Sequence, residues 1–284
     1  MIINKYQNSP KILSLHPTMQ CDYGCLNCYL KKDIADLKEK PKDFFVDLVK
    51  VAKSCGMEEI ALPINYVETG KEDINLDYYI AMQQVCKEEN IKLTMTCNYD
   101  FFESYPYIDK SGISLVSISM NDFVTPTKEK RDKCLSTMKR LKEIIPVVNC
   151  NILLSKNMVK VLKQGLADEI LAVADTMYLL TSKPLNIPIA QYYSWCMELN
   201  DDGILVDSPR ILLDTCMKYS MGLTGGICDK HKMIYVNPYG EIKMCSFDSK
   251  NMAVLASAVD FRDIYSKHFP LPVVESCSLM EGKK

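Results

Sequence analysis

The chain has 284 residues, 48% hydrophobic and 25% charged, which is the ordinary composition of a globular protein with one large domain and an appendage, or two small domains. Its 34 Lys and Arg residues against 36 Asp and Glu residues give a net charge of −2, a balance that indicates neither a nucleic-acid surface nor a membrane surface. No N-terminal segment has the pattern of a signal peptide, and no apolar stretch is long enough to span a bilayer.

The first predicted strand, residues 11–18, leads into a loop that carries Cys21, Cys25 and Cys28. Spacings of three and then two residues let consecutive sulfurs from one loop reach different corners of a [4Fe–4S] cube, and three thiolates leave one iron without a protein ligand. A structural zinc site is an alternative, but it needs four ligands, and the next cysteine is Cys55. Three unreactive buried thiols are the remaining alternative.

This loop resembles the cluster loop of radical S-adenosylmethionine (SAM) enzymes, and Tyr29 follows the third cysteine as it often does in that superfamily. The resemblance implies a [4Fe–4S] cluster on the three cysteines, with SAM bound at the open iron. It also implies reductive cleavage of SAM to a 5′-deoxyadenosyl radical that abstracts hydrogen. The family commonly has an aromatic residue just before the third cysteine, packed against adenine. Asn27 stands there, so we expect Tyr29 or Leu26 to take that role.

Beyond the loop, strand patterns alternate with helix patterns, which predicts a parallel sheet with crossover helices. The resemblance implies an α/β fold of the partial (β/α)6 TIM barrel type over about residues 10–190, with the reacting groups at the carboxyl ends of the strands. The predicted strands after the loop are 59–65, 91–96, 112–120, 146–154 and 176–180, and the predicted helices are 44–55, 75–90, 126–144 and 157–174.

The end of the second strand departs from the family pattern. Many radical SAM enzymes have a Gly-Gly-Glu motif there that contacts the amine of SAM, whereas residues 62–65 read Leu-Pro-Ile-Asn. We expect Asn65, as a neutral oxygen, or Glu68, as a charged one, to replace that contact. The alternative for Glu68 is an ordinary solvated loop residue.

Polar side chains mark the fourth and fifth strands. By the period of two, Ser117 shares a face with Ser119, and Asn149 shares a face with Asn151. In radical SAM enzymes, polar groups on these strands meet the ribose and methionine parts of SAM. The resemblance therefore predicts SAM contacts from Ser119 and Asn151. The alternative is that such side chains hydrogen-bond to neighbouring strands.

The pattern changes after residue 202. Two short apolar runs, 232–236 and 241–245, flank a turn at 237–240 and predict a β-hairpin. This region resembles the auxiliary-cluster extension called SPASM or, in its shortened form, twitch. We expect a radical SAM partial barrel over residues 1–200 and a small twitch-like hairpin and helix extension over residues 201–284.

Cys228 lies ahead of this hairpin, Cys245 lies at its end, and Cys277 is the one cysteine farther along the chain. The resemblance implies that these three hold a second, auxiliary [4Fe–4S] cluster. His231 is an alternative ligand. A zinc site built from the same residues, or a hairpin that binds no metal, remain alternatives.

Thirteen cysteines without a secretion signal favour a reducing cytoplasm over a disulfide framework, so we expect a cytoplasmic protein. Free cysteine behaves as a small buried hydrophobe. Seven cysteines fall at apolar positions of predicted helices and strands, and we expect them in the core: Cys55, Cys86, Cys97, Cys134, Cys150, Cys196 and Cys216.

The leading hypothesis is a radical SAM enzyme that modifies a peptide, as twitch and SPASM relatives often do in natural-product maturation. Its partners would be the substrate and an external electron donor of the flavodoxin or ferredoxin type, with no nucleic acid and no membrane. One alternative is a radical SAM enzyme that acts on a small molecule or a nucleoside. Another is a non-catalytic accessory protein that binds an iron–sulfur cluster or zinc, which the missing Gly-Gly-Glu favours.

Overall fold

The computed structural model describes residues 10–22, 38–64, 74–120, 127–182, 187–221, 223, 233–246 and 251–269. The chain forms two compact units. The first unit contains Met1–Asp22, Leu30–Met95 and Gly226–Lys284, and the second contains Tyr23–Tyr29 and Thr96–Gly225. The predicted boundary between a partial barrel over residues 1–200 and a twitch-like extension over residues 201–284 stays a prediction.

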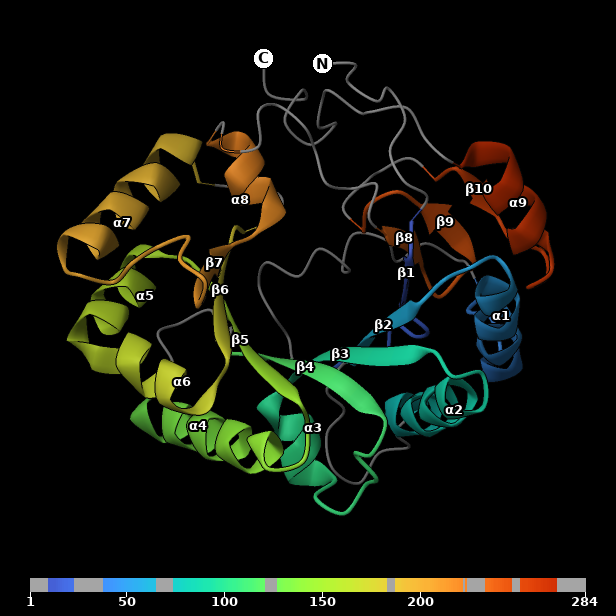
Figure 1. The fold of residues 1–284 in the computed structure, drawn as a ribbon, viewed down its shortest axis with the longest axis horizontal. Coiled ribbons are helices and arrows are strands. Elements are labelled where there is room, and N and C mark those ends of the chain that lie inside the picture. Colours follow the sequence, from blue (N-terminus) through green and yellow to red (C-terminus); the bar gives the residue numbers. More distant parts are fainter. Residues whose placement is uncertain are drawn as a thin grey trace. The chain divides into compact units, whose positions relative to one another are not determined.

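The sheet of the first unit is formed by strands from both ends of the chain (Figure 1). Strand β1 pairs in parallel with β2 on one side and with β8 on the other, and β9 runs antiparallel to both β8 and β10. The strand order is β10-β9-β8-β1-β2-β3. The bounds are β1 Ile12–Leu15, β2 Glu59–Ile64, β3 Lys92–Asn98, β8 Met233–Val236, β9 Glu241–Lys243 and β10 Ala253–Val254.

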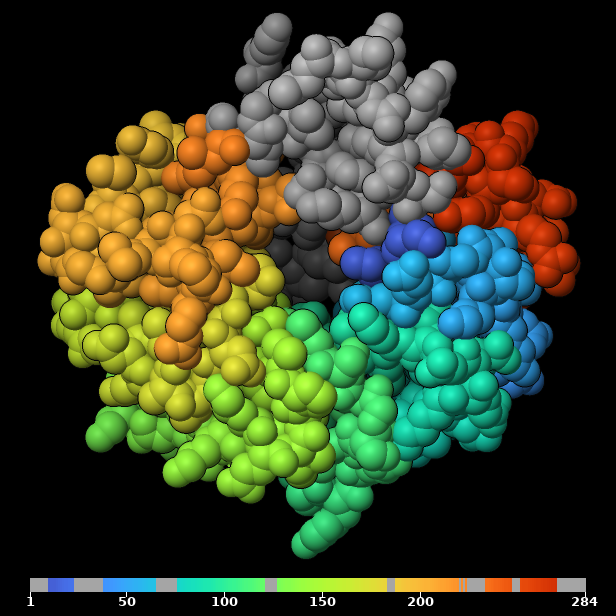
Figure 2. Space-filling model, viewed as in Figure 1, coloured from blue at the N-terminus to red at the C-terminus, as the bar shows by residue number. Residues whose placement is uncertain are grey.

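Three helices, α1 (Lys42–Ser54), α2 (Ile74–Glu88) and α9 (Asp260–His268), belong to the first unit. Helix α1 buries an apolar stripe, and α9 lies beside α1 although the two are far apart in the sequence (Figures 1 and 2, blue and red). The Arg262 guanidinium on α9 donates to the Ser54 hydroxyl on α1 at 3.2 Å. One face of the sheet is fully apolar and buried, with Leu13, Leu15, Ile60, Ile234, Val236 and Ile242 each 0% exposed.

The second unit contains a parallel sheet in the order β4-β5-β6-β7. Its strands are β4 (Ile113–Ser119), β5 (Val147–Leu153), β6 (Thr176–Leu180) and β7 (Ile211–Leu213). The helices are α3 (Tyr99–Ser104), α4 (Lys128–Lys142), α5 (Lys156–Val161), α6 (Ala167–Val173), α7 (Ile189–Asp201) and α8 (Thr215–Ser220). Helices α7 and α8 pack against each other on one side of this unit (Figure 1).

The two faces of the β4–β5 ladder differ in chemistry. Val116, Ile118, Val148, Cys150 and Ile152 point to one face and are completely buried. Apolar side chains of α4 belong to the same core, including Cys134 and Met138, which are completely buried too. The other face carries polar side chains, and burial of the apolar face thus fixes which side chains remain for binding.

All six predicted strands are present as β1 to β6, the hairpin is present as β8 and β9, and the helices predicted at 44–55, 75–90 and 126–144 are α1, α2 and α4. The single helix predicted at 157–174 is wrong. The structure has α5, a π-helical turn at Leu162–Leu166 and then α6, because Gly165 takes a φ of 106° that interrupts the helix. Glycine adopts such a backbone without the clash that a Cβ would cause.

Five of the seven predicted core cysteines are buried. The prediction is wrong for Cys55 and Cys216, which are half-buried because Cys55 is the C-cap of α1 and Cys216 lies in the first turn of the short helix α8. In the described ranges, no helix is long and apolar enough to cross a membrane.

Candidate functional site

The chain leaves the carboxyl end of β1 and brings Cys21 to the surface. His16 and Thr18 are 0% and 1% exposed, and Cys21 is exposed. The backbone N–H of His16 donates to the Val236 carbonyl at 2.9 Å, which continues the pairing of β1 with β8. The exposed thiol of Cys21 is thus presented by a buried, hydrogen-bonded segment, whereas Cys25, Cys28 and Tyr29 lie outside the described residues.

The β8–β9 hairpin places Cys245 away from the carboxyl end of β1. Tyr235 on β8 lies opposite Lys243 on β9, and half-buried Cys245 follows two residues later. Since β9 is antiparallel to β8, Cys245 follows a strand end that lies beside the amino end of β8. Cys21 follows the carboxyl end of β1, which runs parallel to β8. The two cysteines therefore follow opposite ends of these strands.

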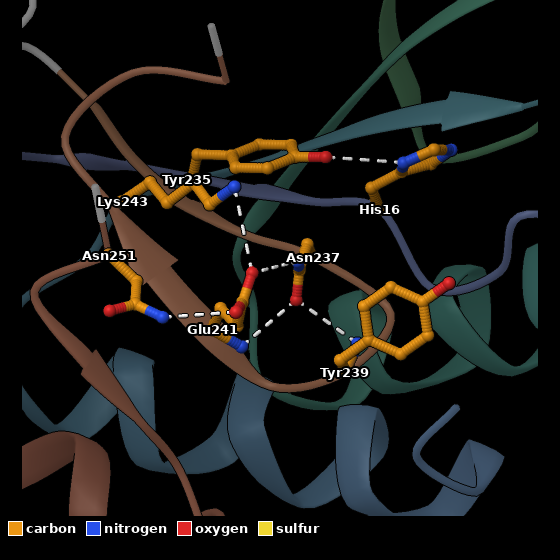
Figure 3. Close-up of polar contacts among 7 residues, drawn as sticks. All are labelled: His16, Tyr235, Asn237, Tyr239, Glu241, Lys243 and Asn251. Carbon is orange, nitrogen blue, oxygen red and sulfur yellow. Dashed lines mark hydrogen bonds and ion pairs between the residues drawn. The ribbon is translucent and has the colours of Figure 1, made fainter. Parts of the chain in front are cut away.

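A hydrogen-bonded network shapes the turn of this hairpin (Figure 3). The Glu241 carboxylate accepts from the side-chain amides of Asn237 at 2.6 Å and Asn251 at 3.0 Å, and it lies 3.6 Å from the Lys243 ammonium. The Asn237 side-chain oxygen accepts from the backbone N–H groups of Tyr239 and Glu241. Buried Lys243 is therefore paired, as a buried charge requires. Cys228, His231 and Cys277 lie outside the described residues.

The hydroxyl of Tyr235 lies 3.2 Å from Nδ1 of His16 (Figure 3). Both side chains are buried; Tyr235 lies on β8, and His16 directly follows β1, the strand that pairs in parallel with β8. The contact joins the chain ahead of Cys21 to the hairpin that ends near Cys245. Sequence reasoning identified neither partner, because the two residues are 219 positions apart.

The second unit contains two rows of polar side chains on one face of its sheet. Ser119 on β4 is opposite Asn151 on β5, which is opposite Tyr178 on β6. Two residues closer to the amino ends of the strands, Ser117 is opposite Asn149, which is opposite Thr176. The predicted shared face is confirmed by this register. Tyr178 and Thr176 were not identified from the sequence, although their period of two on the sixth strand is a signal that would have found them.

The buried Asn149 has an oxygen to offer a ligand. Asn149 is 3% exposed, and its Oδ1 has no hydrogen-bond partner. A buried polar atom without a partner costs free energy, so such atoms commonly mark the place of a ligand or an ordered water. Ser119 and Asn151 are half-buried next to it. The polar face therefore fits a ligand with hydroxyl and amine donors, which SAM possesses.

Polar groups also meet at the carboxyl ends of β6 and β7. The Asp214 carboxylate accepts from the backbone N–H of Thr181 at 3.0 Å and from its hydroxyl at 3.2 Å, and it also accepts from the N–H of Met217 as the N-cap of α8. The N–H of Ser182 donates to the Tyr192 hydroxyl at 3.0 Å, whereas Oγ of Ser182 is buried without a partner. The Asp214 N-cap pattern was the available sequence signal for this cluster.

The buried thiols differ in chemistry from Cys21. Burial raises the pKa of the Cys86 and Cys134 thiols to about 12 and the pKa of Cys196 to about 11. Burial also raises the pKa of Cys97 and of Cys150 well above the ordinary range. A metal ligand is a thiolate, so these five are poor ligands.

Within the described ranges, no three His, Cys, Asp or Glu side chains form a group that would hold a metal ion. Of the six predicted cysteine ligands, those ranges include Cys21 and Cys245. Asn65 and Glu68, the predicted contacts of the SAM amine, also lie outside them. The donor set of each predicted centre, three cysteine sulfurs, suits an iron–sulfur cluster.

No family model matches the sequence, and no curated protein matches it. Among solved structures, the chain is similar to SuiB of Streptococcus suis bound to the precursor peptide SuiA, with a TM-score of 0.67, 15% identity, and coverage of 98% of this chain and 74% of that chain. The chain has the fold of SuiB. It is also similar to SuiB bound to S-adenosylmethionine, with a TM-score of 0.63, 17% identity, and coverage of 91% of this chain and 64% of that chain.

The similarity to SuiB confirms the predicted α/β fold of the partial-barrel class, which is the fold that the cysteine loop led us to expect. The chain spans between 64% and 74% of the SuiB chains it matches. At 15% to 17% identity, the likeness shows the fold alone.

Proposed function

We propose that the chain is a radical SAM enzyme that modifies a peptide. The observation that carries this proposal is that a loop with three cysteines follows β1 of a fold shared with SuiB, whose structures contain SAM or a precursor peptide. A cluster with bound SAM supplies one-electron cleavage of SAM, which yields a radical able to abstract hydrogen from an unactivated carbon.

The residues of this chain divide the work between holding the cluster and holding SAM. Cys21, Cys25 and Cys28 would ligate three irons of a [4Fe–4S] cluster and leave the fourth for SAM. Ser119 and Asn151 would bind the polar parts of SAM, and the unpartnered oxygen of Asn149 beside them supports that assignment.

The remaining SAM contacts rest on the family resemblance. Tyr29 would pack against adenine. Asn65 or Glu68 would accept from the amine in place of the missing Gly-Gly-Glu. A neutral and a charged acceptor differ in how strongly they hold an ammonium group, so the two assignments predict different affinities for SAM.

An auxiliary [4Fe–4S] cluster on Cys228, Cys245 and Cys277 is part of the proposal. The placement of Cys245 and Cys21 after opposite ends of the β1, β8 and β9 strands supports two separate centres. Three protein thiolates would leave one iron of the auxiliary cluster open to the substrate or to an electron acceptor. An external donor of the flavodoxin or ferredoxin type would supply the electron for SAM cleavage in the cytoplasm.

The test is anaerobic reconstitution of the wild type with iron and sulfide, followed by counting of both per chain. Deoxyadenosine release from SAM is then measured under dithionite, with and without candidate peptides, and the peptides are examined by mass spectrometry. We expect about eight irons per chain, SAM cleavage and a peptide mass change. Zinc in place of iron, or an intact cluster that never cleaves SAM, would support the accessory-protein alternative. Deoxyadenosine without a peptide mass change would count against a peptide substrate.

A further inference from the structure

One carboxylate contacts the chain immediately ahead of Cys21. Oε2 of Glu39 accepts from the Thr18 hydroxyl at 2.9 Å, and Oε1 accepts from the backbone N–H of Met19 at 2.6 Å. The N–H of Gln20 in turn donates to the Thr18 hydroxyl at 3.1 Å. Hydrogen bonds to a charged acceptor are about twice as strong as neutral ones. Three consecutive residues are therefore tied, directly or through Thr18, to Glu39.

Glu39 is itself held in place by its neighbour in the sequence. The backbone N–H of Lys40 donates to the carbonyl of Pro238 at 2.8 Å, and the Tyr78 hydroxyl donates to the carbonyl of Lys40 at 3.0 Å. Pro238 directly follows Asn237, whose side chain shapes the hairpin turn (Figure 3). Lys40 thus has backbone contacts on both sides, which limits the positions open to the carboxylate of Glu39.

The opposite side of the same segment is attached to β8. His16 donates its N–H to Val236 and meets the Tyr235 hydroxyl. Residues 16–20 are therefore held by β8 at their start and by Glu39 at their end, and Cys21 is the next residue. The contact between Met19 and Glu39 also joins the two ends of the segment that contains Cys21, Cys25 and Cys28.

We propose that Glu39 is a positioning residue for Cys21, which acts by holding the backbone of Thr18 and Met19 so that the Cys21 thiolate stands where a cluster needs it. This role rests on the proposed function, because it treats Cys21 as a cluster ligand. Both carboxylate oxygens of Glu39 contact Thr18 and Met19, so its role is to position the chain and not to ligate iron. Because Glu39 already orders the chain ahead of Cys21, cluster binding does not have to supply the conformational free energy of ordering it.

The variants separate the two halves of the contact. Glu39→Ala removes both acceptors. Glu39→Gln keeps a carbonyl oxygen for the Met19 N–H and an amide that can donate to the Thr18 oxygen, so it preserves much of the contact. Glu58→Ala is the matched control, because Glu58 is an exposed carboxylate of the same unit that pairs with Lys11 at 3.2 Å. Exposed pairs of that kind contribute little to stability.

The first measurement is hydrogen–deuterium exchange of the Met19 amide in the metal-free chain. We expect Glu39→Ala to exchange about 10-fold faster than the wild type, Glu39→Gln less than about 3-fold faster, and Glu58→Ala at the wild-type rate. Thermal melting verifies that each variant is folded, and Thr18→Val, which removes the hydroxyl that donates to Glu39, replaces Glu39→Ala if that variant does not fold. Equal exchange in Glu39→Ala and the wild type would overturn the proposal.

The second measurement is iron retained after anaerobic reconstitution and gel filtration, with the electron paramagnetic resonance spectrum of the reduced protein. We expect Glu39→Ala to lose at least half of the signal of the N-terminal cluster and to broaden the remainder, and Glu39→Gln to restore both. Wild-type iron and spectrum in Glu39→Ala would overturn the positioning role alone. A wild type that binds no iron would overturn the proposed function and the cluster role with it, whereas the exchange rates still report on the contact itself.

Discussion

Ser119 on β4 and Asn151 on β5 occupy opposing positions on neighbouring parallel strands. Both are half-buried on the polar face of the sheet, while the alternate residues Ile118, Cys150 and Ile152 are completely buried on the other face. The apolar face holds the strands against the helices, so the polar pair is free of a packing role. Removal of either polar side chain tests ligand binding more than folding.

Ser119→Ala and Asn151→Ala should each weaken SAM binding. The loss of one neutral hydrogen bond corresponds to about a 5- to 10-fold lower affinity. Equilibrium binding of SAM to the reconstituted enzyme measures the effect. Ser194→Ala is the control, because Ser194 is exposed on α7, and it should leave the affinity unchanged. Equal affinity in all three variants and the wild type would remove Ser119 and Asn151 from the SAM site.

Asn149→Leu should change stability and affinity in opposite directions. Replacement of a buried side chain whose Oδ1 has no partner by an apolar one of similar size should raise the free energy of unfolding by about 1 kcal/mol. The same change should weaken SAM binding. Urea denaturation and SAM titration measure the two effects. Asn149→Asp is the contrasting variant and should destabilise the chain, because it buries an unpaired charge. A less stable Asn149→Leu would contradict the interpretation.

The cysteine ligands should separate into two groups by their effect on turnover. Cys21→Ala, Cys25→Ala or Cys28→Ala should abolish deoxyadenosine formation. Cys245→Ala should leave SAM cleavage intact but abolish formation of the peptide product. Cys245 lies at the end of the β1, β8 and β9 strands opposite to Cys21. Iron counts, deoxyadenosine and peptide mass are the measurements.

Cys55→Ala is the control for these variants, since Cys55 is a half-buried cap residue of α1 outside both cysteine sets. It should retain iron, SAM cleavage and product at wild-type levels. Full product formation by Cys245→Ala would exclude an essential auxiliary cluster on that residue.

Tyr192→Phe should destabilise the second unit. The Tyr192 hydroxyl accepts from the buried N–H of Ser182 at 3.0 Å, and removal of that oxygen leaves the N–H without this acceptor. The expected cost is about 1 to 2 kcal/mol of unfolding free energy, measured by urea denaturation. Tyr193→Phe is the matched control, because Tyr193 is 54% exposed on the same helix and should change stability by less than about 0.5 kcal/mol. Equal stability of the two variants would contradict the role of this contact.

Thiol labelling should follow burial and pKa. With a pKa of about 12, the Cys86 and Cys134 thiols are ionised in about one molecule in ten thousand at pH 8, so iodoacetamide should not label them in the folded, metal-free chain. Exposed Cys21 should be labelled under the same conditions. Peptide mass spectrometry gives the extent at each site. Because a raised pKa requires more alkaline conditions for ionisation, labelling of Cys86 should increase as the pH rises toward 12. Rapid labelling of Cys86 at pH 8 would show that its environment opens.

Local patterns identified much of this protein. The alternation that places Ser117 and Ser119 on one face follows from the period of two in any strand, so it was readable without knowing the neighbours. The hairpin of β8 and β9 was readable because the turn between them is short. The interruption at Gly165 was missed because a glycine within an apolar helical pattern is compatible with either a continuous or a broken helix.

The contacts of Glu39 with Thr18 and Met19 were not readable from the sequence. They join residues about 20 positions apart through one surface carboxylate, and 36 acidic residues offered the same chemistry. The pairing of Tyr178 with Asn151 was unreadable for a related reason. Backbone hydrogen bonds are alike in every strand, so a strand's composition does not name its partner or its register.

The sequence by itself determined the chemistry that the chain offers: three cysteines brought together by covalent spacing, and polar side chains placed on one face by the strand period. The tertiary structure decided where that chemistry is held. The parallel pairing of β8 with β1 joins strands from the N-terminal and C-terminal parts of the chain and places Cys21 and Cys245 at opposite ends of these strands. That outcome depends on which apolar faces bury against each other, a property of the whole fold that no short segment contains.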